Sequence, residues 1–175
     1  MSDLVTQAAV YAIGAHDAVG QVRKYTGEPY WTHPQAVAEL ISDHGFDDNV
    51  IAAAWMHDLV EDTQITLAQI EENFGHVIAS FVSDVTDISK PEDGNRKVRK
   101  RIDLEHLAKA SYEGKSIKLA DMIHNSETIM KHDPNFARVY MREKKDLLEQ
   151  ALYDGHPDLL NKAWEIVNNY YASNP

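Results

Sequence analysis

The chain contains no cysteine among its 175 residues, which excludes disulfides, thiolate metal sites and cysteine nucleophiles together. It also lacks any run of about 18 apolar residues, so no transmembrane helix is expected. Its first residues carry neither the basic region nor the apolar stretch of a signal peptide. These absences predict a cytoplasmic protein that does not enter a membrane.

Basic residues are scarce, with 17 Lys and Arg against 28 Asp and Glu and a formal charge of −11. Extended nucleic-acid binding relies on phosphate neutralisation by Lys and Arg, so DNA and RNA are not expected as partners. The basic residues that are present cluster at 23–24, 96–101 and 115–118. A few local cations can outweigh the global field, so a small phosphorylated ligand stays compatible with this charge. The middle cluster reads equally well as a solvated helix face.

Apolar residues recur at helical spacing along the chain, and no segment alternates with the period of two that is typical of strands. Thr32 is expected to cap a helix that stops at Gly45, and Thr66 with Gln69 matches a capping box before Gly75. Gly114 is expected to separate two later helices. Further helices are predicted over residues 3–19, 48–62, 76–88, 95–111, 115–131, 135–153 and 157–172. The sequence therefore predicts one all-α domain of about eight or more helices that covers residues 1–175.

An apolar, alanine-rich segment is followed by the charged run His57-Asp58-Leu59-Val60-Glu61-Asp62. Imidazoles and carboxylates are costly to bury unless they are paired or coordinate a metal. His33 and Asp121 also lie among apolar residues, and both are candidates to complete a metal site with His57 and Asp58. Two imidazoles and two carboxylates suit Mn, Fe, Co, Ni or Zn better than Ca. On a continuous helix, Glu61 and Asp62 would stand one turn beyond these ligands, where a proton-handling pair belongs.

Simpler interpretations apply to each of these residues when it is taken alone. A single buried His is more often a hydrogen-bonded core residue than a metal ligand. Glu61 and Asp62 could form an ordinary polar helix end, although acids there oppose the helix dipole. Five other histidines lie in polar contexts and are expected at the surface, whereas His16 is ambiguous: His44, His76, His106, His132 and His156. The joint pattern within apolar helices is what favours a metal site.

The order His33, His57-Asp58, Asp121 resembles the HD superfamily of metal-dependent phosphohydrolases. Further motifs narrow the resemblance to the hydrolase domain of RelA/SpoT-type alarmone enzymes: Arg23-Lys24, Gly27-Glu28-Pro29-Tyr30, His33-Pro34, Glu61-Asp62-Thr63, and Ile117 to Asp121 followed by His124-Asn125. The match spans roughly residues 8 to 130. The chain has no room for a synthetase domain, so we expect a stand-alone small alarmone hydrolase of the Mesh1-like type.

The resemblance implies hydrolysis of the 3′-diphosphate of ppGpp or pppGpp, which releases pyrophosphate and GDP or GTP. It implies one Mn(II) ion, held by His33, His57, Asp58 and Asp121. It also implies a pair of catalytic carboxylates, Glu61 and Asp62. It also implies substrate contacts: Arg23 and Lys24 at the purine and phosphates, Asn125 and Thr128 at the sugar or its phosphates, and Arg101 and Lys118 near the diphosphate. Guanidinium stacking suits a base face.

Three residues depart from the family pattern: Tyr25 beside the basic pair, Met122 after Asp121, and Glu127 where an arginine is common. The departures leave open an adenosine analogue such as (p)ppApp. Another HD nucleotidase, or a phosphatase acting on a cofactor such as NADPH, is a further alternative. A helical binding module with a structural metal is the non-enzymatic one, although it would be expected to lose Glu61 or Asp62. Apolar stripes at 141–152 and 164–171 are more often core than interface, which leaves a homodimer open.

Overall fold

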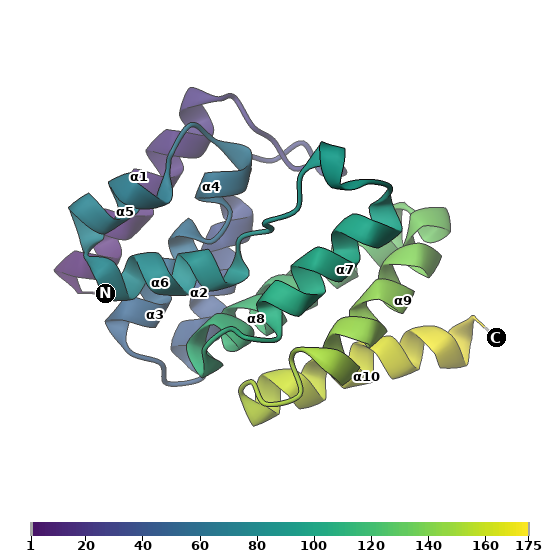
Figure 1. Cartoon of the computed structure of the whole chain (residues 1–175). Helices are drawn as coiled ribbons and strands as arrows, with labels where there is room; N and C mark the ends of the chain where they lie inside the picture. The colour runs from purple at the N-terminus through teal and green to yellow at the C-terminus, as the bar shows by residue number, and fades with distance from the viewer. Residues whose placement is uncertain (1, 175) are drawn as a thin grey trace. The chain divides into compact units, whose positions relative to one another are not determined.

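The computed structural model describes residues 2–174, which are almost entirely helical. The elements are α1 (Asp3–Ala18), α2 (Thr32–Asp43), α3 (Asp48–Met56), α4 (Leu59–Asp62), α5 (Leu67–Phe74), α6 (His76–Val85), a 3₁₀ turn η1 (Pro91–Asp93), α7 (Arg96–Leu107), α8 (Tyr112–His132), α9 (Pro134–Gln150) and α10 (Pro157–Ser173) (Figure 1). Within residues 2–174 the only extended pairing is one antiparallel bridge, between Val22 and Pro29. The prediction of an all-α fold is confirmed. No helix in this range is long and apolar enough to span a bilayer.

The chain divides into two compact units, one ending at Thr86 and the other beginning at Asp87. In the first unit, α3 packs against α1, α2 and α6. Its three alanines, Ala52 to Ala54, are fully buried, and small side chains let neighbouring helices approach closely on several sides. A helix that is apolar on nearly all faces belongs at the centre of its unit. The sequence placed this segment there, and the structure agrees.

The capping signals were predicted with mixed success. Thr66 and Gln69 form the expected capping box before α5, which ends at Gly75. Thr32 does not cap α2, because it is already the first helical residue and its hydroxyl donates to the Pro29 carbonyl at 2.9 Å. Gly114 is not a break either. It lies in the first turn of α8, where its backbone N–H donates to the Ser111 side chain at 3.0 Å.

The predicted continuous helix over residues 48–62 is wrong. α3 ends at Met56, and His57 and Asp58 form a turn before α4 begins at Leu59. Asp58 has φ −97° and ψ −3°, near the edge of the helical region. Aspartate is a poor residue for a helix interior, and its carboxylate here is held by side chains outside the helix. Apolar periodicity does not reveal such a turn, since the segments on both sides remain helical.

In the second unit, α8 packs against α9 and α10, and α9 also contacts α7. Most of the first half of α8 is buried, including Ile117, Leu119 and Ala120 at 0% exposure. The segment before α7 is held by Asp103, whose carboxylate accepts hydrogen bonds from the backbone of Ile88 and from Ser89 at 2.9 to 3.1 Å. This unit contains the predicted site residues Asp121, Lys118, Asn125, Thr128 and Arg101.

Candidate metal centre

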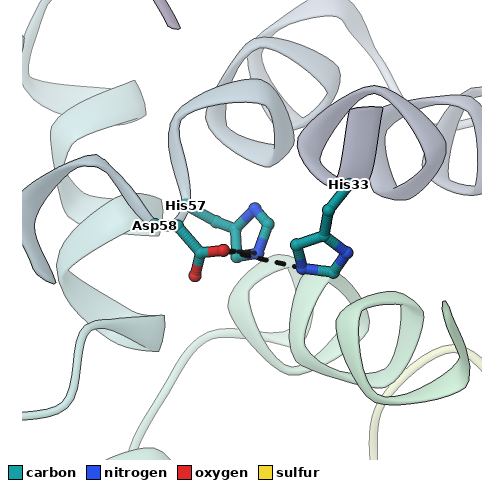
Figure 2. A group of neighbouring side chains, drawn as sticks. All are labelled: His33, His57 and Asp58. Carbon is teal, nitrogen blue, oxygen red and sulfur yellow. Dashed lines mark ion pairs between the residues drawn. The ribbon is translucent and has the colours of Figure 1, made fainter. Parts of the chain in front are cut away.

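His33, His57 and Asp58 come together in the first unit, with one ligand atom from each lying within 4.8 Å of the others. The Asp58 Oδ2 atom is 3.2 Å from Nε2 of His57 and 3.5 Å from Nε2 of His33. Figure 2 shows the His33 imidazole on one helix pointing toward the neighbouring side chains of His57 and Asp58 on another segment. His33 is 0% and His57 is 1% exposed, whereas the Asp58 side chain keeps 15% exposure. Three of the four predicted ligands therefore lie together, and their role as metal ligands stays a prediction.

Local structure fixes which nitrogen of His57 faces the centre. Nδ1 of His57 lies 2.8 Å from the Ala54 carbonyl, one turn back at the end of α3. A carbonyl can only accept, so Nδ1 carries the proton and Nε2 of the neutral ring presents its lone pair. A second ring nitrogen bonded to a backbone carbonyl is the usual arrangement for metal-binding histidines. His33 reaches the same point from the first turn of α2.

Tyr30 holds the carboxylate of Asp58, a candidate ligand, in place. Its hydroxyl donates to Oδ2 of Asp58 at 2.7 Å, and its ring lies edge-on to His33 with centroids 5.9 Å apart. No role was predicted for Tyr30, although it ends the Gly27-Glu28-Pro29-Tyr30 motif. The signal that could have found it is its position three residues before His33, which brings its ring beside that ligand.

Replacing Tyr30 with Phe is expected to weaken divalent-metal binding by about 10- to 100-fold, because the ring stays but Asp58 loses its hydrogen bond. Isothermal titration with Mn²⁺ measures the effect. Tyr153→Phe is a suitable control, since Tyr153 is 62% exposed in the second unit. An unchanged dissociation constant in Tyr30→Phe would show that the hydroxyl does not orient the ligand.

The two predicted catalytic carboxylates lie on the short helix α4, directly after the ligand turn. Glu61 and Asp62 are both exposed, so neither is committed to the core. Asp62 accepts a hydrogen bond at 2.9 Å from Nε2 of Gln21, a residue that the sequence had not singled out. α4 packs against α1, and the hydrogen bond from Gln21 places Asp62 beside the loop that follows α1.

That loop carries the predicted purine-binding pair. Its backbone folds back on itself, with Arg23 N–H donating to the Glu28 carbonyl at 2.8 Å, and Gly27 takes φ +74° at the tip. A positive φ favours glycine because it has no Cβ. The Arg23 guanidinium lies 5.8 Å from the Tyr30 ring centre, and the Lys24 ammonium lies 4.7 Å from that of Tyr25.

The remaining predicted site residues lie in the second unit. Asp121 is buried on α8, 3.0 Å from Nζ of Lys118, and it accepts from Nδ2 of Asn125 at 2.6 Å. Thr128 is half-exposed one turn further on, and Arg101 is exposed on α7, paired with Glu105. The structure thus groups Asp121, Lys118 and Asn125. Their assignment to the same site as His33 and His57 stays a prediction.

The departures from the family pattern fall in different environments. Met122 is 1% exposed and belongs to the core. Glu127 is exposed on α8. Tyr25 is half-buried, and its hydroxyl accepts a hydrogen bond from Nζ of Lys24 at 3.2 Å. Glu127 and Tyr25 therefore remain available to influence ligand choice.

Lys144, on α9, was missed by the sequence analysis. Its pKa is lowered to about 8 by burial, together with the positive charges of Lys118 and Lys100, against the opposing charges of Asp121 and Asp87. Its ammonium lies 4.8 Å from the Tyr140 ring centre. The only sequence signal was a lysine beside an apolar stripe, which is ordinary on an amphipathic helix.

An NMR titration of the Lys144 side chain is expected to give a midpoint near pH 8, because burial favours the neutral amine. Lys118→Met is expected to raise that midpoint, since it removes a nearby positive charge. A midpoint at the ordinary lysine value of about 10.4, unchanged by Lys118→Met, would contradict this account.

A family model described as "HD domain" matches residues 8–149. The chain belongs to the HD domain family. This HD domain is 36% identical over 138 residues to "Guanosine-3′,5′-bis(diphosphate) 3′-pyrophosphohydrolase MESH1" of Xenopus tropicalis, and the match covers 75% of this chain and 72% of that protein. It is 39% identical over 136 residues to a "Probable guanosine-3′,5′-bis(diphosphate) 3′-pyrophosphohydrolase" of Synechocystis, covering 76% of this chain but only 18% of that protein.

A solved structure described as a metazoan ortholog of SpoT that hydrolyzes ppGpp superposes on the HD domain with a TM-score of 0.85. The two share 29% identity, and the match covers 97% of this chain and 96% of the other. By contrast, the chain spans only about a fifth to a quarter of several curated relatives, such as 20% of SpoT of Escherichia coli at 33% identity. The matches to MESH1 and to the solved structure cover most of this chain and most of the matched chain in each case.

The donor set of the HD domain fits a divalent ion. Two imidazole nitrogens and a carboxylate oxygen converge in a largely buried place, and the His57 tautomer leaves its lone pair directed inward. Buried groups of this kind are stabilised by a cation, and mixed N/O ligands suit a borderline metal. His33, His57 and Asp58 would hold the ion.

Proposed function

We propose that this HD domain, acting as one domain over residues 1–175, is a metal-dependent 3′-pyrophosphohydrolase of ppGpp and pppGpp. The observation that carries the proposal is the convergence of His33, His57 and Asp58 in a chain similar over most of its length to MESH1. The retained Glu61-Asp62 pair beside these ligands supports an enzyme rather than a binding module. Its partner is then a small phosphorylated nucleotide, which a few local cations can bind despite the acidic net charge of the chain.

The ion is proposed to be Mn²⁺, with Asp121 as the fourth ligand that the sequence motif predicts. When bound, such an ion acidifies water and withdraws charge from a phosphoryl oxygen. The sequence order and motif carry the assignment of Asp121, and its burial and hydrogen bond with Asn125 are consistent with a held carboxylate. The cytoplasmic location and a homodimer remain predictions from the sequence.

The carboxylates of α4 are proposed to move the protons. Hydrolysis forms a bond from a water oxygen to the phosphorus on the ribose 3′-oxygen, and the bond between that phosphorus and the 3′-oxygen breaks. One carboxylate takes the proton that the water loses, and the other delivers a proton to the leaving 3′-oxygen. Glu61 and Asp62 are adjacent in the sequence, and both side chains are exposed to solvent.

The cations of the chain are proposed to bind the rest of the nucleotide. The Arg23 guanidinium, held over the Tyr30 ring, offers a flat charged face for a purine, and Lys24 lies next to it. Asn125, Thr128, Lys118 and Arg101 are proposed to contact the sugar and phosphates. Glu127 stands where the family commonly has an arginine, so adenosine analogues are alternative substrates.

The decisive experiment supplies ppGpp and ppApp side by side, with Mn²⁺ and with a chelator, and measures pyrophosphate and nucleoside diphosphate. Metal-dependent release of equal amounts of pyrophosphate and GDP is the expected result. Faster release from ppApp would move the substrate to the adenosine series. Orthophosphate from NADPH or from nucleoside monophosphates, with no pyrophosphate from either alarmone, would replace the proposal with another HD phosphohydrolase.

A further inference from the structure

His16 is a buried, ionisable residue that the proposed reaction does not use. It lies in the last turn of α1 with 0% exposure, in the same unit as His33, His57 and Asp58. Nδ1 of His16 is 2.7 Å from Oε1 of Gln21. Its Nε2 atom is buried and has no hydrogen-bond partner among residues 2–174. An imidazole buried in this way, with only one bonded nitrogen, calls for an explanation.

The hydrogen bonds that link His16 through Gln21 to Asp62 on α4 can run in only one direction. An ionised Asp62 carboxylate only accepts, so the Gln21 amide must present Nε2 to it, as the 2.9 Å contact has it. Oε1 of Gln21 then faces His16 and can only accept, so Nδ1 of His16 must donate. The proton of the neutral ring therefore sits on Nδ1. Burial lowers the pKa of His16, against the hydrogen bond with Gln21 and the charges of Asp58 and Asp62, which favours this neutral form.

The His16 ring also contacts the residue that holds the metal ligand. Its centroid is 4.8 Å from that of Tyr30, whose hydroxyl donates to Asp58. Backbone bonds tie the same parts together, with Gln21 N–H donating to the His16 carbonyl at 3.2 Å and Tyr30 N–H donating to the Gln21 carbonyl at 3.1 Å. The buried ring of His16 thus contacts both Tyr30, which is bonded to Asp58, and Gln21, which is bonded to Asp62.

Asp62 needs such support because of where it stands. It is exposed at the end of a helix of only four residues, and it follows a turn. A carboxylate there has many side-chain conformations available, whereas proton transfer needs one orientation toward the reacting oxygen. The Gln21 amide is the only hydrogen-bond donor to the Asp62 side chain in the described part of the chain.

We propose that His16 and Gln21 are positioning residues, in which the His16 Nδ1–H fixes the Gln21 amide and that amide fixes the Asp62 carboxylate. The inference rests on the proposed function, since it assumes that Asp62 takes part in the hydrolysis. A purely structural His16 would support packing of α1 without affecting Asp62, so the two roles differ in what substitutions do to turnover.

The kinetic test uses the full chain loaded with Mn²⁺ and ppGpp as substrate. Gln21→Met keeps the length of the side chain and removes the donor, and we expect kcat to fall about 10- to 100-fold with KM changed less than about twofold. His16→Leu is expected to lower kcat similarly, and His16→Asn, whose amide can donate from near the Nδ1 position, to restore most of it. The double variant Gln21→Met/His16→Leu is expected to be no worse than Gln21→Met, because both act through one path.

A matched control lies on α1, the helix that carries His16. Gln7 donates to Oδ2 of Asp3 at 2.9 Å, an exposed bond of the same kind, and Gln7→Met is expected to leave kcat unchanged. Equal kcat in Gln21→Met and wild type would overturn the proposal. A His16→Asn variant as impaired as His16→Leu, with unfolding temperatures matched, would also overturn it, because packing alone would then explain the loss.

A second measurement does not need turnover. Side-chain ¹⁵N NMR is expected to identify His16 as the Nδ1–H tautomer and to give well-separated resonances for the two Gln21 amide protons, since only one faces Asp62. His16→Leu and Asp62→Asn are each expected to reduce that separation. If the wild-type chain hydrolyses no nucleotide, the proposed function fails. An Nε2–H tautomer, or Gln21 resonances unmoved by both substitutions, overturns the positioning inference in either case.

Discussion

Changing Glu61 to Gln and Asp62 to Asn together is expected to lower kcat for pyrophosphate release by about 10³-fold or more, while metal content stays the same. Both replacements keep the size and hydrogen-bonding reach of the side chains but remove the ability to carry a proton at neutral pH. Both residues are exposed on α4, so little effect on folding stability is expected. The measurement is single-turnover hydrolysis of ppGpp alongside metal analysis of the purified protein.

The matched control is Glu71→Gln, on the exposed face of α5, where the carboxylate pairs with His76 at 3.0 Å. Its kcat should equal that of the wild type. The single variants separate the two roles, because loss of the proton donor alone should matter least for substrates with better leaving groups. Undiminished turnover in the double variant would remove the carboxylate pair from the mechanism and leave only the metal site.

Asp58→Asn is expected to abolish metal binding and, with it, activity. The amide keeps the shape of the side chain and can still accept from Tyr30, but it lacks the negative charge that lies 3.2 Å from His57 and 3.5 Å from His33. The affinity loss should exceed the roughly 10- to 100-fold that follows removal of a hydrogen bond to a ligand. Calorimetric titration with Mn²⁺ gives the dissociation constant directly.

Thermal unfolding provides an independent measure of the same site. An ion that binds only the folded chain raises the unfolding temperature, and this rise should disappear in Asp58→Asn. Asp43→Asn, at the exposed end of α2, should keep both the rise and the affinity of the wild type. Metal binding by Asp58→Asn with unchanged affinity would show that the ion is held elsewhere.

Most of the helices, and the candidate ligands, could be predicted from the sequence because each rests on a local pattern. The capping box at Thr66 and Gln69 is written in residues three apart, and the apolar run before His57 marks a central helix. His33, His57 and Asp58 were named as candidate ligands because ionisable groups are costly to bury in apolar helices unless they are paired or bind a metal. These are properties that single residues and their immediate neighbours determine.

Other parts of the site depend on contacts between distant residues, and these were not predictable. Gln21 meets Asp62 across 41 positions of the chain, and Tyr30 meets Asp58 across 28. Neither glutamine nor tyrosine is unusual in a loop, so neither stood out. The turn at Asp58 was missed for a related reason, because what holds its carboxylate comes from another segment.

The turn between α3 and α4 separates the candidate metal ligands from the two predicted catalytic carboxylates. His57 follows the central helix of its unit and Asp58 is fixed by Tyr30, whereas Glu61 and Asp62 belong to a short helix of their own. One residue added within α4 would rotate whatever follows it by about 100°. The ligands precede that helix and would keep their places. Within this fold, natural variation can therefore redirect the proposed acid–base groups toward a different leaving group without changing the candidate metal ligands.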